Sequence, residues 1–171
     1  MYTLIMNIFA QATKAPEPKT KDARRISIFY AGILLVMVVA QLFTFEEFLL
    51  LITSFDLPGG VRFAHFLTAF LVVAEVFALP FLLRMPLSIA FRWVSMTLAL
   101  IAALIWVFLS IWLVAEVKAA SNIGFLGTVV DIMPGLWAVF ISIALVILAI
   151  WAAWGLWPLN RGAIRVKKHA K

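Results

Sequence analysis

Glu75 is the residue of this sequence best placed to carry chemistry, because it lies in the middle of an apolar run. A carboxyl at the centre of a bilayer costs about 2.5–3.5 kcal/mol on insertion scales, so Glu75 should face other helices rather than lipid. There it is either protonated or hydrogen-bonded, and Tyr30, Thr97, Trp151 and Trp154 are its candidate partners. Glu75 could accept a proton or face a quinone ring, with Tyr30, Trp151 and Trp154 around it. It could equally form a structural hydrogen bond between helices.

A second group of polar residues is expected near the outer end of the helix that carries Glu75. The group comprises His65, Gln41, Glu46, Glu47 and Asp131. A histidine with several carboxylates could bind a divalent cation or relay protons, and His65, Glu46, Glu47 and Asp131 are the candidate ligands. They come from separate segments without the spacing of a metal motif, so ordinary wetted polar groups in the interface are the preferred explanation. No metal site is assigned.

Residue counts exclude two kinds of redox centre within this chain. The sequence has no cysteine, so it can hold no disulfide, thiolate metal site or iron–sulfur cluster. A haem between two histidines would need both on facing helices, whereas His65 and His169 are expected on opposite sides of the membrane. We therefore predict no intrinsic cofactor, with a quinone or a bound lipid as the candidate ligands.

The elements that position these residues must be membrane-spanning helices. The chain is 65% hydrophobic with a mean hydropathy of +1.11, whereas soluble domains are about 45–50% apolar. One water-soluble core cannot hide that surplus, so lipid must cover much of it. The formal net charge of +6 then reflects membrane topology and contact with lipid headgroups, and we expect no nucleic-acid partner.

The hydropathy pattern predicts an all-α integral membrane protein, a bundle of four transmembrane helices. The spans are expected at residues 26–45, 61–83, 92–114 and 135–157, between an N-terminal segment (1–25, its start a surface helix) and a basic tail (158–171). A single helix over residues 26–55 would be about 45 Å long, too long for one span. We therefore predict a break near Thr44–Glu46 and a short amphipathic segment in the outer interface. The loop at 115–134 is expected to pack on a surface through its apolar residues.

Orientation follows from the distribution of lysine and arginine. Five lie in the N-terminal segment, two in the loop between the second and third spans and five in the tail; the other side has Arg62 and Lys118. The positive-inside rule then places both termini in the cytoplasm, and the bacterial inner membrane is the expected location. Trp93, Trp112 and Trp157 fall near predicted helix ends, as in an aromatic belt.

A pattern across the first two spans resembles a known family. It consists of AQLFTFEEF (residues 40–48), Leu51, FDLP (55–58), FLVVAEVF (70–77) and LLR (82–84). Over roughly Tyr30–Arg92 this resembles the DoxX-like superfamily of small four-helix membrane proteins, especially its MauE-like branch. In that branch a phe-glu-x-phe segment and a leu-pro turn precede a helix with a glutamate, a leu-leu end and a basic residue. Many members have a lysine where this chain has Gln41, so a lysine-dependent role is not carried over.

The resemblance implies a link to redox assemblies in the membrane. Members are associated with quinone-coupled sulfur oxidation, oxidative-stress complexes and maturation of disulfide-rich redox proteins. Lacking cysteine, this chain cannot itself exchange disulfides. We expect an accessory or structural subunit of a larger membrane assembly, or a partner of a redox protein, surrounded by the lipid bilayer. The alternatives are a quinone-binding oxidoreductase subunit with Glu75 as proton acceptor, and a small transporter or channel.

Overall fold

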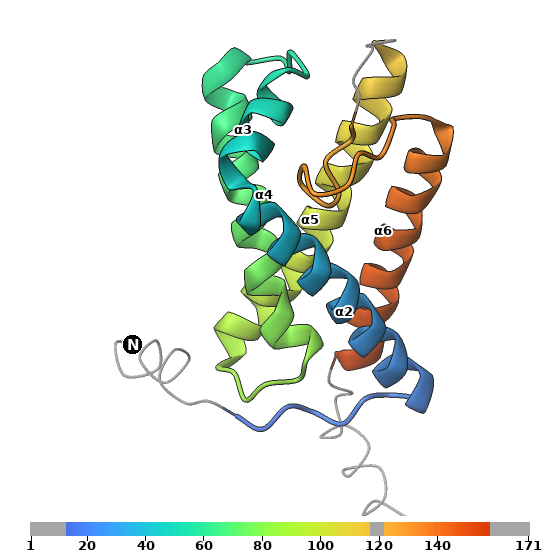
Figure 1. The fold of residues 1–171 in the computed structure, drawn as a ribbon. Helices are drawn as coiled ribbons and strands as arrows, with labels where there is room; N and C mark the ends of the chain where they lie inside the picture. The colour runs from blue at the N-terminus through green and yellow to red at the C-terminus, as the bar shows by residue number, and fades with distance from the viewer. Residues whose placement is uncertain (1–12, 117–121, 158–171) are drawn as a thin grey trace, which may run out of the picture.

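The computed structural model describes residues 13–116 and 122–157, and every regular element in that part is a helix (Figure 1). Four helices of 21 to 27 residues are long and apolar enough to cross a membrane. They are α2 (Lys21–Phe43), α4 (Gly60–Leu82), α5 (Ile89–Ala115) and α6 (Leu136–Leu156). The predicted class, an α-helical integral membrane protein with four spans, agrees with these helices.

Two of the helices begin earlier than the sequence predicted. Helix α2 begins at Lys21 instead of residue 26, because the Thr20 side chain accepts a hydrogen bond from Ala23 N at 3.0 Å and caps the helix. Helix α5 begins at Ile89 instead of residue 92, because the Ser88 side chain accepts one from Phe91 N at 3.2 Å. Both side chains satisfy backbone donors that a helix start leaves free. Charge in the first turn of α2 and Pro86 before α5 had assigned these turns to loops.

A short helix follows α2 after a bend at Thr44. Helix α3 (Phe45–Thr53) buries Phe48 and Ile52 against the bundle, whereas Glu46 is exposed. The amphipathic character expected for this segment is therefore present. Its location in the outer membrane interface stays a prediction.

The four long helices form a closed ring in which each helix packs against two others. Helix α2 lies between α4 and α6, and α5 lies between the same two helices on the other side (Figure 1). The buried face of α6 is made of small residues, among them Ala138, Ser142, Ala149 and Ala152. Small residues let helix backbones approach closely, which is the usual packing mode inside a bilayer.

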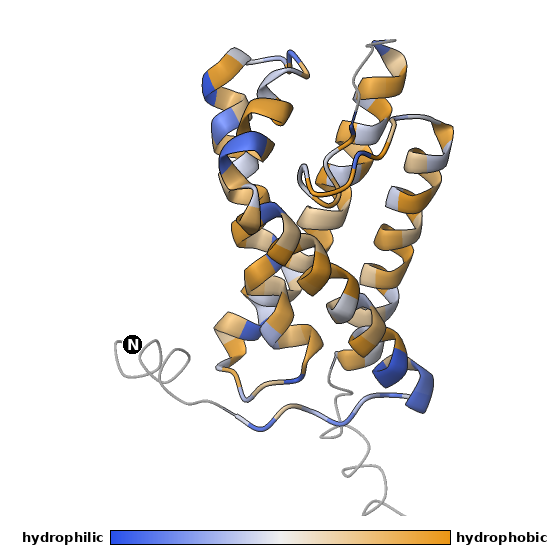
Figure 2. Ribbon diagram, viewed as in Figure 1, coloured by the Kyte–Doolittle hydropathy of each residue, from blue (hydrophilic) through white to orange (hydrophobic). Residues whose placement is uncertain are grey.

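The outer surface of the ring is apolar along its whole length. Large side chains point outward from every long helix, for example Phe29 (62% exposed), Phe66 (64%), Leu104 (54%) and Phe140 (70%). Figure 2 shows the hydrophobic colour over the helices, with the hydrophilic colour concentrated toward the two ends. This surface is consistent with contact with a lipid bilayer.

The described chain starts and finishes at the same end of the bundle, which we call the base (Figure 1). Residues 13–20 run across it, and Lys19 N donates to Gly155 O at 2.9 Å. At the start of this segment Thr13 N donates to Leu87 O at 3.1 Å, beside the loop between α4 and α5. The predicted surface helix near the N-terminus and the basic tail lie outside the described residues.

Candidate functional site

Glu75 is fully buried in the middle of α4 and is hydrogen-bonded to a neighbouring helix. The indole Nε1–H of Trp106 on α5 donates to Glu75 Oε1 at 2.7 Å. Trp106 is itself 0% exposed. The expectation that Glu75 faces the bundle is met in this arrangement. Trp106 was not among its predicted partners.

Antiparallel packing explains how these two side chains meet. In α4 and α5 the Cα–Cβ bonds tilt toward each helix N-terminus, and the two helices run in opposite directions. Ser95 Oγ on α5 contacts Ala78 O on α4 at 3.4 Å, which places the Trp106 backbone farther from the base than Glu75. The Glu75 side chain reaches away from the base and the Trp106 side chain reaches back toward it, so the gap closes.

Gln41 on α2 is the second polar neighbour of Glu75. Its side chain is 0% exposed and lies beside the Glu75 carboxyl. Gln41 Nε2 also donates to the backbone carbonyl of Phe125 at 3.2 Å. Under strict hydrogen-bond geometry, Gln41 Oε1 and Glu75 Oε2 are buried without a partner among the described residues. Three helices and a loop therefore meet at this carboxyl.

Tyr30 completes the polar cluster on the side toward the base. Its ring is buried, and its hydroxyl donates to Ala99 O on α5 at 2.9 Å. The phenol lies close enough to Glu75 to feel its charge. Tyr30 thus belongs to the environment of Glu75 as predicted, although its hydrogen bond goes to the α5 backbone. We call Tyr30, Gln41, Glu75 and Trp106 the polar cluster.

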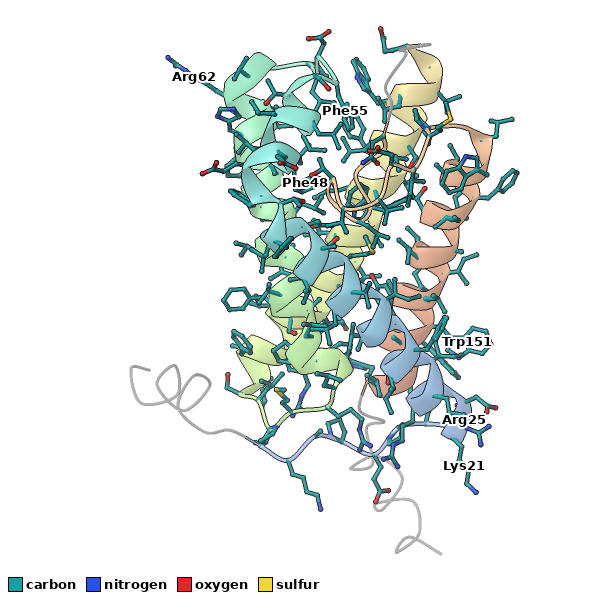
Figure 3. All side chains as sticks on the ribbon, viewed as in Figure 1. Lys21, Arg25, Phe48, Phe55, Arg62 and Trp151 are labelled. Atoms are coloured by element: carbon teal, nitrogen blue, oxygen red, sulfur yellow. The ribbon has the colours of Figure 1, made fainter. Side chains whose placement is uncertain are left out.

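Aromatic rings enclose the indole of Trp106. Phe48 of α3 stacks on it with ring centroids 6.5 Å apart, and Phe125 of the loop lies 4.7 Å away. Figure 3 shows Phe48 and Phe55 directed from the α3 region into the bundle. The polar cluster is therefore sealed on the side away from the base by apolar rings.

The loop that supplies Phe125 is held in shape by Asn122. The Asn122 amide donates to Gly127 O at 3.0 Å and to Val130 O at 3.2 Å, and its carbonyl oxygen accepts from Gly124 N at 2.8 Å. Thr128 N donates to Thr44 Oγ1 at 3.1 Å and ties the loop to the bend after α2.

The described part of this loop, residues 122–135, inserts between the helices at the end opposite the base (Figure 1). The predicted packing through apolar residues holds for Ile123 and Phe125, which are 0% and 5% exposed. Val129 and Val130 point outward instead, 54% and 45% exposed. The loop therefore acts as a plug over the polar cluster.

Pro80 interrupts α4 on the base side of Glu75, and Ser95 of α5 fills the interruption. Ser95 Oγ donates to Phe77 O at 2.5 Å and accepts from Phe81 N at 3.1 Å. In a regular helix those two backbone groups would bond to each other, so the hydroxyl is inserted into the ladder. This contact ties α4 to α5 a second time.

Trp151 and Trp154 do not reach Glu75, which corrects their assignment as partners. They lie on the outward face of α6, 46% and 54% exposed, in a shallow groove with Ile147 and Ile150. Figure 3 shows Trp151 pointing away from the bundle. Thr97 is also exposed. The inward face of α6 is made of small residues, so the tryptophans of this helix can only face outward.

The candidate metal ligands are exposed and are not assembled into one group. Within residues 13–116 and 122–157, no three acidic or histidine side chains come together at a site for an ion. Glu47 Oε2 instead accepts from Thr128 Oγ1 at 2.5 Å, and Asp131 Oδ1 accepts from Asn122 Nδ2 at 3.3 Å. His65 and Glu46 are exposed on α4 and α3. The two acids with described partners stabilise the plug loop.

Trp106 could have been found from the sequence by one signal. It is a tryptophan in the middle of a span, where a lipid-facing indole would leave its N–H without a partner. Tryptophans near the ends, such as Trp93 and Trp157 with ring centroids 4.0 Å apart at the base, face no such constraint.

The fold and the polar cluster define the class of this protein: a four-helix integral membrane protein with a buried hydrogen-bonded carboxyl. Comparison with protein-family models, curated proteins and solved structures gives no match. The resemblance to the DoxX-like superfamily stays a prediction.

Proposed function

We propose that this chain is an accessory membrane protein of the DoxX-like type, without catalysis of its own. It would serve as a structural subunit of a larger, redox-linked membrane assembly or as the partner of a redox protein. The observation that carries the proposal is the position of Glu75. This buried carboxyl is engaged by the Trp106 indole at 2.7 Å, and Phe48 and Phe125 pack against that indole.

The geometry around Glu75 favours a role in holding helices together. Its carboxyl joins α4 to α5 through Trp106 and lies beside Gln41 of α2, which in turn donates to the loop. Four grooves of the described chain are lined by residues at the base or on the outer face of α6, and Glu75 lines none of these four. A substrate could reach the carboxyl after displacement of Phe125.

Mass spectrometry of the tagged protein purified from its native membrane in mild detergent tests the proposal. We expect stoichiometric membrane or redox subunits to co-purify with the wild type. The matched variant Glu75→Gln keeps the size and hydrogen bonding of the side chain, so the same partners should co-purify in the same ratio. Recovery of the chain without protein partners would contradict the proposal.

A quinone-linked role for Glu75 is the second candidate, favoured by the two buried oxygens without partners. A quinol hydroxyl could donate to Glu75 Oε2, which would accept its proton. Both electrons and the second proton of the quinol would pass to a separate redox subunit. This candidate predicts that Glu75→Gln abolishes quinol oxidation by the purified assembly while its composition is unchanged. Turnover that survives the substitution would exclude it.

A further inference from the structure

A groove at the base of the bundle brings together three cationic side chains from distant parts of the sequence. Lys14 comes from the segment crossing the base, Arg24 from the first turn of α2 and Arg84 from the end of α4. The rest of its lining is mostly apolar: Ala15, Ile28, Leu82, Leu83 and Pro86. We call this the basal groove.

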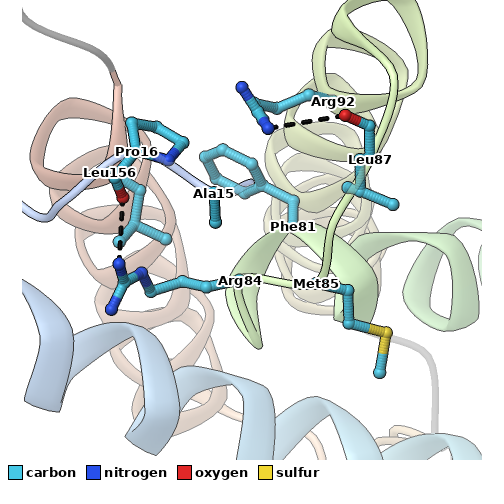
Figure 4. A pocket seen from close by; sticks show the side chains of 8 residues that line it. All are labelled: Ala15, Pro16, Phe81, Arg84, Met85, Leu87, Arg92 and Leu156. Atoms are coloured by element: carbon cyan, nitrogen blue, oxygen red, sulfur yellow. Dashed lines mark hydrogen bonds between the residues drawn. The ribbon is translucent and has the colours of Figure 1, made fainter. Parts of the chain in front are cut away.

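The Arg84 side chain is held in place by a hydrogen bond that uses only part of its N–H donors. Its backbone is left-handed, with a φ of 58°, and its Nη2 donates to Pro16 O at 3.0 Å (Figure 4). The buried Nε has no hydrogen-bond partner among the described residues. A guanidinium presents five N–H donors, so most of its capacity is available to an acceptor.

The start of the segment that carries Lys14 is anchored by Arg92. Its Nη2 donates to Thr13 O and to Thr13 Oγ1, each at 3.2 Å, and to Leu87 O at 3.5 Å (Figure 4). Residues 13–20 are thereby tied to the loop between α4 and α5. The three cations are consequently presented by a fixed framework.

The basal groove is lined by cations and by no acid. Glu17 lies in the adjoining groove with Arg24, and Asp22 pairs with Arg25 at 3.7 Å on another face of α2. Three such charges within one groove attract an anion.

The groove opens onto surface that faces lipid. Ile28 and Leu83 line it and are 51% and 45% exposed, and Phe29 beside them is 62% exposed. A ligand that fits has an anionic head and an apolar body. We propose that the basal groove binds an anionic phospholipid, with its phosphate against Lys14, Arg24 and Arg84. Its acyl chains lie along the outer seam between α2 and α4.

Native mass spectrometry of the full chain, released from nanodiscs that contain equal phosphatidylglycerol and phosphatidylcholine, tests the site. We expect the wild type to retain one phosphatidylglycerol in preference to phosphatidylcholine. Lys14→Gln and Arg24→Gln change exposed side chains, so folding is preserved, and each should weaken retention by about fivefold. Arg25→Gln is the matched control, because it removes the same charge one residue along α2 outside the groove. It should retain the lipid.

Each alternative outcome would overturn the proposal. Equal retention of the two lipids by the wild type would show that the groove does not select an anionic headgroup. An equal loss in Arg25→Gln would show that general charge at the base is responsible. Displacement of phosphatidylglycerol by glycerol 3-phosphate at similar concentration would assign the groove to a soluble phosphate instead of a lipid.

Discussion

Glu75 and Gln41 present a pairing problem that a single proton resolves. Ionised Glu75 offers acceptors only, and Gln41 Oε1 is a second buried acceptor without a partner among the described residues. Gln41 Nε2 uses one of its two N–H groups on Phe125 O. Exchanging the positions of the Gln41 amide oxygen and nitrogen would place two acceptors, Gln41 Oε1 and Phe125 O, against each other. A proton on Glu75 Oε2 lets the carboxylic acid donate to Gln41 Oε1. The result is a continuous chain from Trp106 through Glu75 and Gln41 to Phe125.

Two substitutions at Glu75 test this hydrogen-bonded chain. Glu75→Gln can accept from Trp106 and donate to Gln41, as the neutral acid does, so stability should change by less than about 0.5 kcal/mol. Glu75→Met has a similar shape but leaves Trp106 Nε1–H unpaired, which should cost about 1–2 kcal/mol. Unfolding in a detergent mixture, followed by tryptophan fluorescence, measures both. If Glu75→Gln were as unstable as Glu75→Met, the ionised carboxylate would be the form that the fold requires.

The sequence alone identified the buried carboxyl of Glu75, but it did not identify the Trp106 indole that donates to it. Burial follows from the cost of a carboxyl in lipid, and Tyr30 was among the partners expected from that reasoning. Gln41 was instead grouped with His65 at the outer end. Candidate partners of Glu75 were chosen because they were expected at a similar depth in the membrane, and this criterion missed Trp106. With Ser95 level with Ala78, Trp106 is eleven residues farther along α5 and level with position 67 of α4, eight residues from Glu75. Eight residues rise about 12 Å, a gap that only two long side chains leaning toward each other can bridge.

Among the elements, the plug loop depends on a glycine that approaches α2 closely. Gly127 has a φ of 58°, and a Cβ there would meet Thr44 Oγ1 and lie 3.1 Å from Ala40 O. Gly127→Ala should therefore loosen the loop and expose the peptide bonds around Phe125. Gly60→Ala is the matched control, since Gly60 has a φ of 69° but nothing within 4 Å of its Cβ position.

Limited proteolysis in detergent compares the two glycine variants. Backbone strain is similar in both, at about 1 kcal/mol, so faster cleavage within residues 122–135 of Gly127→Ala alone reports the steric clash. Equal cleavage of the two variants would show that the contact with the bend at Thr44 does not hold the loop.

The seam between α2 and α6 offers a second comparison at the scale of elements. A Cβ on Gly155 would collide with the Ala23 side chain, whereas Gly32 has nothing within 4 Å of its Cβ position. Alanine normally favours a helix over glycine by about 1 kcal/mol. Gly32→Ala should leave the melting temperature unchanged or raise it, and Gly155→Ala should lower it. A rise in both variants would mean that α2 and α6 separate without cost.

Element boundaries were predictable where turn chemistry is strong. The bend after α2 and the turn before α4 follow from excess length and from the Asp-Leu-Pro-Gly-Gly run. The starts of α2 and α5 were misplaced because their first turns carry charge or flank a proline. In each case a capping hydroxyl, Thr20 or Ser88, extends the helix through that turn. A hydropathy profile scores the polarity of the side chains in these first turns, but it does not detect the hydrogen bond that caps each helix.

For the whole molecule, charge separates the two ends of the bundle. Among the described residues, every lysine and arginine lies at the base except Arg62, and Figure 3 shows Arg62 at the end opposite Lys21 and Arg25. The acids Glu46, Glu47, Asp56 and Asp131 are at the Arg62 end. This asymmetry predicts that the base faces the cytoplasm.

The absence of cysteine from the chain makes this topology directly measurable. A thiol introduced as Arg62→Cys should react in intact cells with a maleimide that cannot cross the inner membrane. A thiol introduced as Lys21→Cys should react only after the membrane is permeabilised. Both side chains are exposed, so reactivity reports the side of the membrane rather than burial. The reverse pattern would invert the orientation.

The hydrogen bond from Lys19 N to Gly155 O bears on the order in which the helices must occur along the chain. Because α6 packs beside α2 and the two join at the base, a short linker from Trp157 to Lys19 would span neighbouring points. Opening the chain between Met85 and Ser88 would then give the circular permutant α5–α6–α2–α3–α4, with both new ends still at the base. Every helix would keep its neighbours and its direction through the bilayer. The architecture therefore specifies a cycle of helices, and the order of helices in this chain is one of several orders compatible with it.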